Sequence, residues 1–211
     1  MKLETVVVTV LSENTYIYYD EKTKEAIVID PGGNSEKIIG AINALGVKVK
    51  GILLTHGHGD HIGAVEKVQA HTGASVFAHK DEEELLKSSK LNMSYYMDDN
   101  PISVTDSKWF EGDEDEYTFG GCTIKVLHTP GHTRGGVSYY DEYEKIVFTG
   151  DTLFLRDVGR TDFPGGNYET LEKSIREKLY TLPDDVIVYP GHGPKTKISK
   201  EKVYNNFVKA L

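Results

Sequence analysis

The chain has 211 residues, 38% of them hydrophobic and 27% charged, which fits one soluble globular domain with a substantial core. Its formal net charge of −9 argues against a general surface for nucleic acids or anionic membranes. Cys122 is the only cysteine, which excludes an internal disulfide framework, and no apolar run reaches the ~18 residues of a membrane span.

The chain is expected to form a single domain over 1–211, because no Pro/Ser-rich linker divides it. Its first residues lack a signal-peptide pattern, and with the single cysteine this favours a cytoplasmic protein.

The first part of the chain is predicted to alternate strands and helices after an opening β meander. Apolar runs of β-type residues predict strands at 4–10, 15–19, 26–29, 49–54 and 74–78. Apolar residues at helical spacing predict helices at 35–45 and about 61–71. This order is typical of a layered α/β protein with parallel strands.

The middle of the chain is less regular. The acidic run 81–84 opens a short helix and is predicted to be a solvated charged face. The connection 88–108 is long for a compact domain, so it is either a lid that contacts substrate or a surface for dimer packing.

The second half is predicted to be rich in β structure again. Strands are expected at 117–119, 122–127, 136–140, 145–149 and 186–189. Cys122 falls inside a strand and is expected to be a small core residue. One amphipathic helix is predicted over 199–211.

The loop after the strand at 49–54 holds the densest cluster of metal-binding residue types, namely His56, His58, Asp60 and His61. The first two histidines are two residues apart, so they point the same way in an extended stretch. The last two residues lie where the loop turns into a helix and can face a second ion. Gly57 and Gly59 are expected to leave room for the cluster and to permit unusual backbone angles. The alternative is a polar loop that is merely rich in histidine.

Similar residue types stand at the ends of other predicted strands. They are Asp30, the pair His128 and His132, Asp151 and His192. Ligands of α/β sheets gather at such strand ends. Imidazole and carboxylate groups suit zinc, with iron and manganese as alternatives.

The pattern His-x-His-x-Asp-His from His56 to His61 resembles the signature of the metallo-β-lactamase superfamily. The order of motifs over 3–196 resembles its short glyoxalase II-like (hydroxyacylglutathione hydrolase-like) members. This resemblance implies a four-layer αβ/βα sandwich, an α/β (α+β) fold with two mixed β-sheets face to face, helices outside and metals at one edge.

The resemblance also implies two divalent cations and a bridging hydroxide. It favours His132 over His128 as a ligand. His56, His58 and His132 would then hold the first ion, and Asp60, His61 and His192 the second. Asp151 would bridge the ions, and Asp60 would also orient the hydroxide. Asp30 is either a turn residue or a carboxylate that orients the metal loop from behind.

The reaction that best fits is hydrolysis of a small-molecule thioester such as S-lactoylglutathione. A thiolate leaves without strong acid help because a thiol pKa is about 8.5, and no general acid stands out in the sequence. Arg160 and Asp162 could pair beside Asp151, either for function or as a structural salt bridge. Arg134 and Tyr168 could contact a substrate carboxylate.

Several points stay open at this stage. We expect no C-terminal helical domain of the kind that grips glutathione in full-length glyoxalase II, so the thiol is undetermined. The protein could be a monomer or a homodimer. The main alternatives are a hydrolase of another ester or lactone and a mononuclear-iron persulfide dioxygenase using His56, His132 and Asp151.

Overall fold

Two six-stranded mixed sheets form the centre of the computed structural model, which describes residues 1–8, 11–97, 101–113 and 115–210. The first sheet has the order β1-β2-β3-β4-β5-β6, with β3 to β6 parallel to one another. Its strands are β1 (Lys2–Val8), β2 (Glu13–Tyr19), β3 (Glu25–Ile29), β4 (Lys48–Leu53), β5 (Ser75–His79) and β6 (Ser107–Phe110).

The second sheet has the order β14-β13-β10-β9-β8-β7, in which only β10 and β13 run parallel. Its strands are β7 (Glu116–Phe119), β8 (Cys122–His128), β9 (Val137–Asp141), β10 (Ile146–Gly150), β13 (Ile187–Pro190) and β14 (Thr196–Lys197). A small hairpin of β11 (Leu153–Phe154) and β12 (Asp157–Val158) lies beside it.

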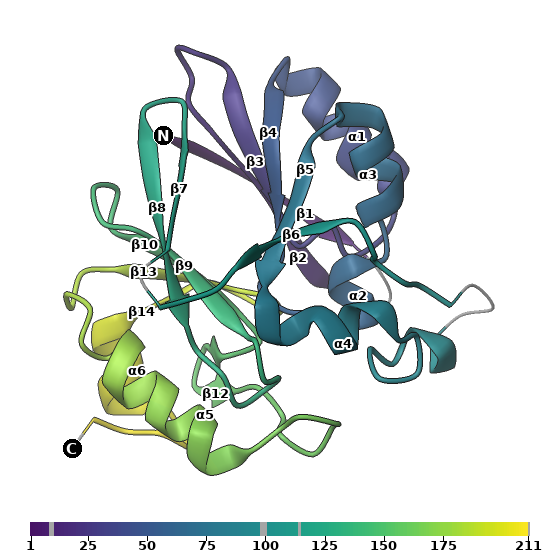
Figure 1. Ribbon diagram of the computed structural model, residues 1–211. Coiled ribbons are helices and arrows are strands. Elements are labelled where there is room, and N and C mark those ends of the chain that lie inside the picture. Colours follow the sequence, from purple (N-terminus) through teal and green to yellow (C-terminus); the bar gives the residue numbers. More distant parts are fainter. Residues whose placement is uncertain (9–10, 98–100, 114, 211) are drawn as a thin grey trace.

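Helices cover the outer face of each sheet (Figure 1). On the first sheet these are α1 (Ser35–Leu45) and α3 (Val65–Thr72), and the second sheet carries α5 (Tyr168–Ser174), continued by a wider turn at Ile175–Leu179, and α6 (Ile198–Tyr204). Short helices α2 (Gly59–Ile62) and α4 (Glu83–Lys87) and 3₁₀ turns at Lys80–Glu82 and Ser94–Tyr96 complete the described elements. The predicted four-layer αβ/βα arrangement is confirmed.

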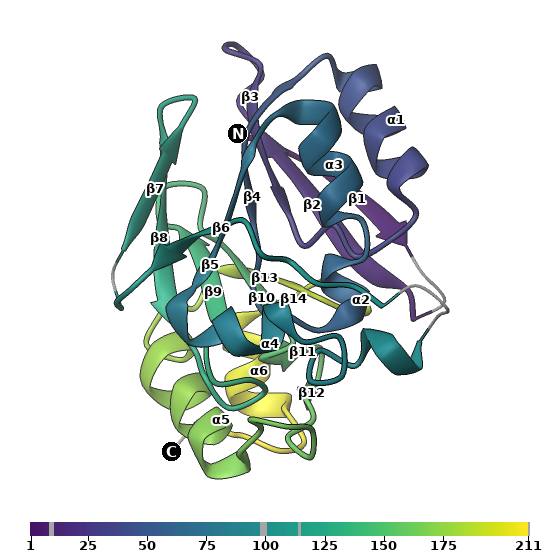
Figure 2. The same ribbon diagram turned by 45° about the vertical axis from the view of Figure 1, so that its right-hand side comes forward.

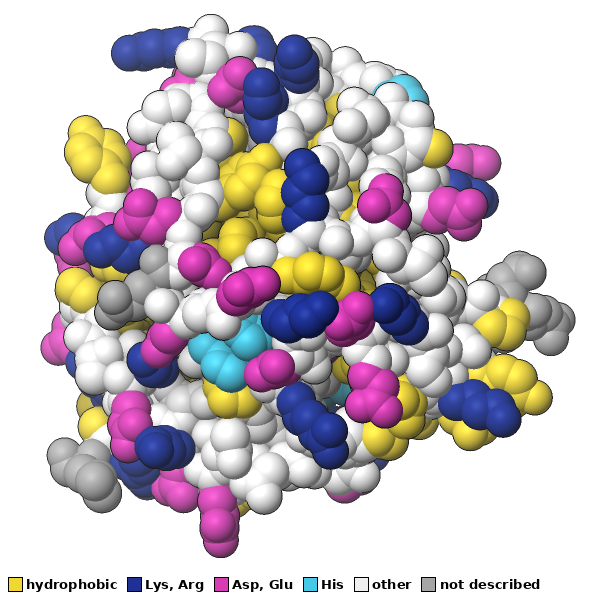
Figure 3. All heavy atoms as spheres, viewed as in Figure 1, with side chains coloured by type: hydrophobic (Ala, Val, Ile, Leu, Met, Phe, Trp, Pro, Cys, Tyr) yellow, Lys and Arg dark blue, Asp and Glu magenta, His cyan; other side chains and the backbone are white. Residues whose placement is uncertain are grey.

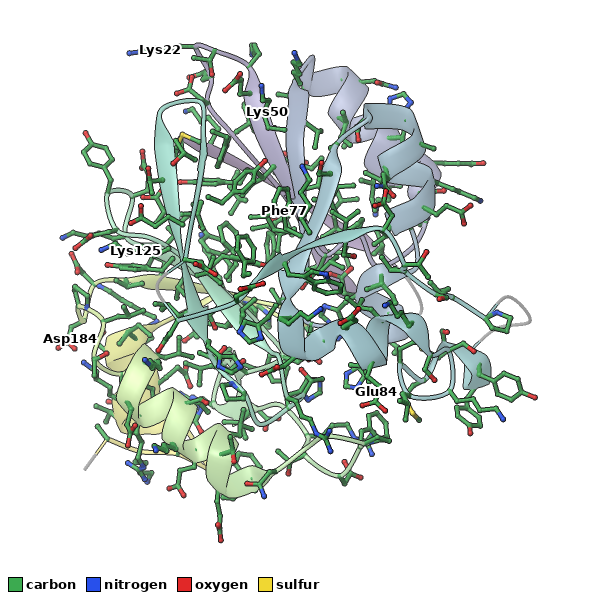
Figure 4. The ribbon with its side chains drawn as sticks, viewed as in Figure 1. Lys22, Lys50, Phe77, Glu84, Lys125 and Asp184 are labelled. Atoms are coloured by element: carbon green, nitrogen blue, oxygen red, sulfur yellow. The ribbon has the colours of Figure 1, made fainter. Side chains whose placement is uncertain are left out.

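Three apolar clusters hold these layers together. The central one lies between the two sheets, where Tyr16 packs on Phe148 with ring centroids 5.1 Å apart. Phe77 from β5 packs against the same cluster (Figure 4). The outer clusters join each sheet to its helices. Such burial on both faces of a sheet is what a sandwich requires.

Two predicted helices have different bounds in the structure. The helix expected at 61–71 is broken into α2 and α3 at Ala64, whose N–H donates to the Pro31 carbonyl at 2.8 Å instead of continuing the helical hydrogen bonds. The helix expected over 199–211 ends at Tyr204, where the Asn205 side chain accepts hydrogen bonds from the Phe207 and Val208 N–H groups and turns the chain back.

The structure also differs from the prediction in the bounds of the first strand and in two elements that were not predicted, β6 and α5. The first strand covers Lys2–Val8 rather than 4–10. Positions 9–10 of that predicted strand and position 211 of the predicted C-terminal helix lie outside the described residues. The connection 88–108, of which 98–100 lie outside the described residues, contains the Ser94–Tyr96 turn and leads into β6, which was not predicted. Helix α5 was also missed, although Leu171, Ile175 and Leu179 have helical spacing and are buried. No described helix is both long and apolar enough to cross a membrane.

Candidate metal centre

All seven predicted ligands converge at one end of the sandwich. Four of them follow β4, and the others follow β8, β10 and β13, so both sheets contribute. Figure 2 shows α2, which begins in the β4 loop, on the same side of the molecule as the β11–β12 hairpin that follows Asp151. The residues are His56, His58, Asp60, His61, His132, Asp151 and His192.

The first set of three is made only of histidines. The rings of His56, His58 and His132 have centroids 4.6 to 4.8 Å apart, and all three are buried. His58 Nδ1 lies 2.9 Å from His132 Nε2. Among the described residues, the buried His56 Nε2 has no hydrogen-bond partner. An unpartnered buried nitrogen beside two other imidazoles fits a metal ligand.

The second set combines histidines with a carboxylate. His61 Nε2 lies 3.3 Å from His192 Nε2, and His192 Nε2 lies 3.2 Å from Asp60 Oδ2. Zinc ligands at about 2.0–2.1 Å in a tetrahedral arrangement are about 3.3 Å from one another. Two of the three donor pairs match this spacing, and the third, His61 Nε2 to Asp60 Oδ2, is 4.0 Å apart.

Asp151 lies between the two sets. Its Oδ1 is 3.2 Å from His61 Nε2, while its Oδ2 is 3.6 Å from both His132 Nε2 and His192 Nε2. The carboxylate thus faces a histidine of each set. From this position the Asp151 carboxylate could bridge two ions.

The second ring nitrogen of four histidines is held by an oxygen atom. Two of the oxygen atoms are side-chain atoms: Asp30 Oδ2 lies 3.0 Å from His61 Nδ1, and Thr55 Oγ1 lies 3.1 Å from His56 Nδ1. The other two are backbone carbonyls: that of Arg160 lies 2.7 Å from His132 Nδ1, and that of Leu11 lies 3.1 Å from His192 Nδ1. An acceptor on one side of an imidazole fixes the tautomer whose other nitrogen is free to bind metal.

Asp30 lies behind the ligands, as the resemblance implied. It accepts hydrogen bonds from the Thr55 backbone N–H at 2.7 Å and the Thr55 hydroxyl at 2.5 Å, besides its contact with His61. Asp30 also groups with His56 and His61 as a possible metal-binding trio. Because both of its carboxylate oxygens already accept hydrogen bonds, we infer that Asp30 orients His61 and Thr55 and does not itself bind an ion.

The two sets differ in their charge state. Burial holds the pKa of His56 well below its usual range, and burial with the neighbouring His132 lowers the pKa of His58 to about 3. Burial also disfavours charge on His61, but Asp151 and Asp60 outweigh it and raise its pKa well above the usual value. The first set therefore offers neutral imidazoles, the form that binds metal.

The predicted Arg160–Asp162 pair forms at the edge of the centre. Arg160 donates two hydrogen bonds of 2.7 Å to the Asp162 carboxylate. Its guanidinium also lies 3.7 Å from the centroid of the Phe163 ring, which in turn lies 5.6 Å from the His58 ring. Phe163 was not predicted as a site residue, and nothing in its local sequence marks it.

The other two predicted substrate contacts are placed differently. Arg134 lines a crevice of 140 Å³ together with Glu84, Leu85 and Pro164. Among the described residues, no carboxylate lies within ion-pair distance of Arg134. Tyr168 starts α5, and its hydroxyl donates to the Phe207 carbonyl at 3.3 Å, so it is engaged with the C-terminal segment.

Two predictions near the centre are wrong. Within the acidic run 81–84, Glu82 is only 1% exposed rather than solvated. Gly57 and Gly59 do not adopt left-handed backbone angles, and their missing side chains make room for Leu86, Glu82 and Ser94 rather than for the histidines. The charge pattern of this run does not indicate that Glu82 is buried.

A further histidine cluster does not resemble the metal centre. His79 and His128 form a possible trio with Asp81, but their rings stack at 4.1 Å with an interplanar angle of 13°. Lone pairs in parallel rings do not converge on one point. The preference for His132 over His128 thus agrees with the geometry.

Comparison with known proteins identifies the family. The model of the metallo-beta-lactamase superfamily matches residues 8–192. The chain is 38% identical to the hydroxyacylglutathione hydrolase GloC of Haemophilus influenzae over 209 residues, which cover 99% of this chain and 98% of that protein.

Solved structures agree. The B3 metallo-beta-lactamase BLEG-1 superposes with a TM-score of 0.92 at 38% identity, covering 98% of this chain and 99% of that one. TTHA1623 in a di-iron-bound form gives 0.84 at 32%, covering 97% and 100%. ETHE1 from Myxococcus xanthus gives 0.79 at 32%, covering 98% and 84%. The chain belongs to the metallo-beta-lactamase superfamily.

Proposed function

We propose that this protein is a dinuclear metal-dependent hydrolase that cleaves small-molecule thioesters of the S-lactoylglutathione type. The observation that carries the proposal is the pair of ligand sets that share Asp151. The near full-length similarity to a hydroxyacylglutathione hydrolase supports the choice of substrate.

Zinc is our first choice for both ions, because the donors are imidazoles and carboxylates. Iron and manganese accept the same donors. The relative TTHA1623 was solved in a di-iron-bound form, which keeps iron as a real alternative.

The chemistry follows from what the residues can do around such ions. When bound, the cations would supply a Lewis acid for a carbonyl oxygen and a water activated near neutral pH. Asp60 is partly accessible and lies beside His192, so its carboxylate can accept a hydrogen bond from the attacking water and orient it. Thioesters suit this site since the thiolate leaves without a strong general acid.

Substrate recognition would use the rim of the centre. Arg134 is the better candidate for a substrate carboxylate, because the Arg160 guanidinium is already bound by Asp162. On the face drawn in Figure 3, the described acidic and basic side chains are interspersed, which suits a small anionic substrate better than a polyanion. We expect a small-molecule partner and a monomer or homodimer.

A second candidate function is a mononuclear-iron persulfide dioxygenase. It would use His56, His132 and Asp151, which this chain also brings together. The presence of Asp60, His61 and His192 at ligand spacing favours the two-ion hydrolase instead. The similarity to BLEG-1 adds β-lactams to the substrates that need testing.

The experiment combines metal analysis with a substrate panel. Protein purified without added metal is analysed for metal content and then assayed, after Zn²⁺ or Fe²⁺ loading, with S-lactoylglutathione, a β-lactam and glutathione persulfide. We expect two ions per chain and the highest kcat/KM for the thioester. Faster β-lactam turnover, or one iron per chain with oxygen uptake on the persulfide, would refute the proposal.

A further inference from the structure

Glu82 is a buried carboxylate beside the metal centre that the proposed chemistry does not use. It ends the 3₁₀ turn Lys80–Glu82 after β5 and is 1% exposed. Among the described residues, no lysine, arginine or histidine lies within ion-pair distance of it. A buried charge without a cationic partner is costly unless hydrogen bonds satisfy it.

Two backbone amides supply those hydrogen bonds. Glu82 Oε2 accepts from the Gly57 N–H at 2.8 Å, and Oε1 accepts from the Gly135 N–H at 2.8 Å. Gly57 stands between His56 and His58, and Gly135 stands three residues after His132. One carboxylate therefore joins the two loops that carry all three histidines of the first set.

The contact leaves no room for a Cβ at Gly135 and little room for one at Gly57. A Cβ at Gly57 would lie 3.2 Å from Glu82 Oε2 and 3.1 Å from Leu86, and a Cβ at Gly135 would lie 2.6 Å from the Glu82 backbone nitrogen. The loops of two different sheets are thus fitted against this one side chain.

The second set of ligands is supported by other groups. His61 is held by Asp30, and His192 is held by the Leu11 carbonyl. Among the described residues, neither hydrogen bond of Glu82 involves Asp30, Asp60, His61 or His192: one reaches the β4 loop at Gly57, between His56 and His58, and the other reaches Gly135. A change at Glu82 should therefore affect the two ions unequally.

We propose that Glu82 is a positioning residue that sets the spacing of His56, His58 and His132 and so determines affinity for the first ion. The inference rests on the two-ion centre of the proposed function, but not on its substrate. A glutamine cannot replace it fully, because its NH₂ group would face one of the two N–H donors.

The test is a titration of metal-free protein with Zn²⁺ against a competing chromophoric chelator, with no substrate present. We expect Glu82→Gln to weaken one ion about 10- to 100-fold while the other stays within about 2-fold of wild type. His58→Ala identifies the ions, since the ion that it retains is the second. The ion weakened by Glu82→Gln should be the one that His58→Ala loses.

Two controls separate positioning from general stability. Glu201, on α6, is another buried glutamate, and it accepts from the Arg156 N–H, the Thr196 hydroxyl and the Asn205 side-chain amide. Glu201→Gln should lower the melting temperature without changing the ratio of the two zinc affinities. Glu84 lies two residues from Glu82 with an exposed side chain (Figure 4), so Glu84→Gln controls for the lost charge.

A second variant decides the question if Glu82→Gln does not fold. Gly57→Ala pushes a methyl group against the same contact from the loop side, and it should also weaken the first ion selectively. The proposal would be overturned if the folded variants bind both ions as tightly as wild type does, or if both sites lose affinity equally. Because no thioester is involved, a wrong substrate assignment would not affect this result.

Discussion

Replacement of Asp30 by asparagine should disable His61 as a ligand without distorting the site. The left-handed backbone of Asp30, with φ 47°, is one that asparagine adopts readily. If the asparagine oxygen keeps the bond to the Thr55 N–H, its NH₂ group takes the place of Oδ2. The Thr55 hydroxyl can rotate to accept from it, but His61 Nδ1 must then lose its proton.

The consequence is a change of tautomer. The proton moves to His61 Nε2, which lies 3.2 Å from Asp151 Oδ1 and would donate to that carboxylate instead of binding an ion. A hydrogen bond to a charged group is worth about 1.5–3 kcal/mol. Since about 1.4 kcal/mol is a tenfold change, we expect the second ion to bind roughly 10- to 100-fold more weakly.

Zinc affinities of both sites, measured by competition with a chelator, check this prediction. Asp162→Asn is the matched control, because Asp162 is exposed and, within the described part of the chain, its side chain is bound only by Arg160, so both affinities should stay unchanged. Melting temperatures of the metal-free proteins report any loss of stability. If metal-free Asp30→Asn is as stable as wild type and binds both ions as tightly, the tautomer argument fails.

Three further predictions concern activity and stability. Dialysis against EDTA should abolish thioester hydrolysis, and Zn²⁺ should restore it, as measured by loss of thioester absorbance; activity that survives metal removal would contradict the assignment. Arg134→Gln should raise KM for S-lactoylglutathione about 10-fold with little change in kcat, whereas Arg160→Gln should change KM less because Asp162 already binds that guanidinium. Burial, with the hydrogen bond from the Cys122 thiol to Asp141 at 2.9 Å, raises the pKa of Cys122, so folding stability should fall as pH rises above the unfolded thiol pKa of about 8.5. Between pH 8 and 10, the free energy of unfolding of wild type should fall by about 1–2 kcal/mol more than that of Cys122→Ala, as measured by urea unfolding. An equal fall in both proteins would refute this.

The ligand loop could be recognised from the sequence because its chemistry is local. His56 to His61 are neighbours along the chain, and they follow an apolar run that forms β4. The strand-end rule then located Asp151 and His192, whose partners lie far away in sequence but at the same edge of the sandwich. Helical spacing would also have predicted α5 and the turn that continues it, because the buried residues Leu171, Ile175 and Leu179 recur every four positions.

Features that depend on contacts between distant segments could not be predicted in this way. The acidic run at 81–84 has the composition of a solvated face, and only the approach of Gly57 and Gly135 makes Glu82 a buried acceptor. Similarly, the break between α2 and α3 coincides with the hydrogen bond from the Ala64 N–H to the Pro31 carbonyl, which belongs to a distant segment. Local patterns carry no information about either approach.

The same reasoning explains why the metal centre depends on the central core. Each ligand set draws residues from both sheets, so its geometry requires the sheets to be held in one relative position. Two hydrogen bonds across the sheets fix that position beside His56: the Tyr139 hydroxyl donates to the Leu54 carbonyl at 2.6 Å, and the Val137 N–H donates to the Thr55 carbonyl at 2.8 Å. Protein cores are close-packed, so the two sheets cannot shift without a cost in free energy, and these hydrogen bonds fix the ligand loop to that rigid core.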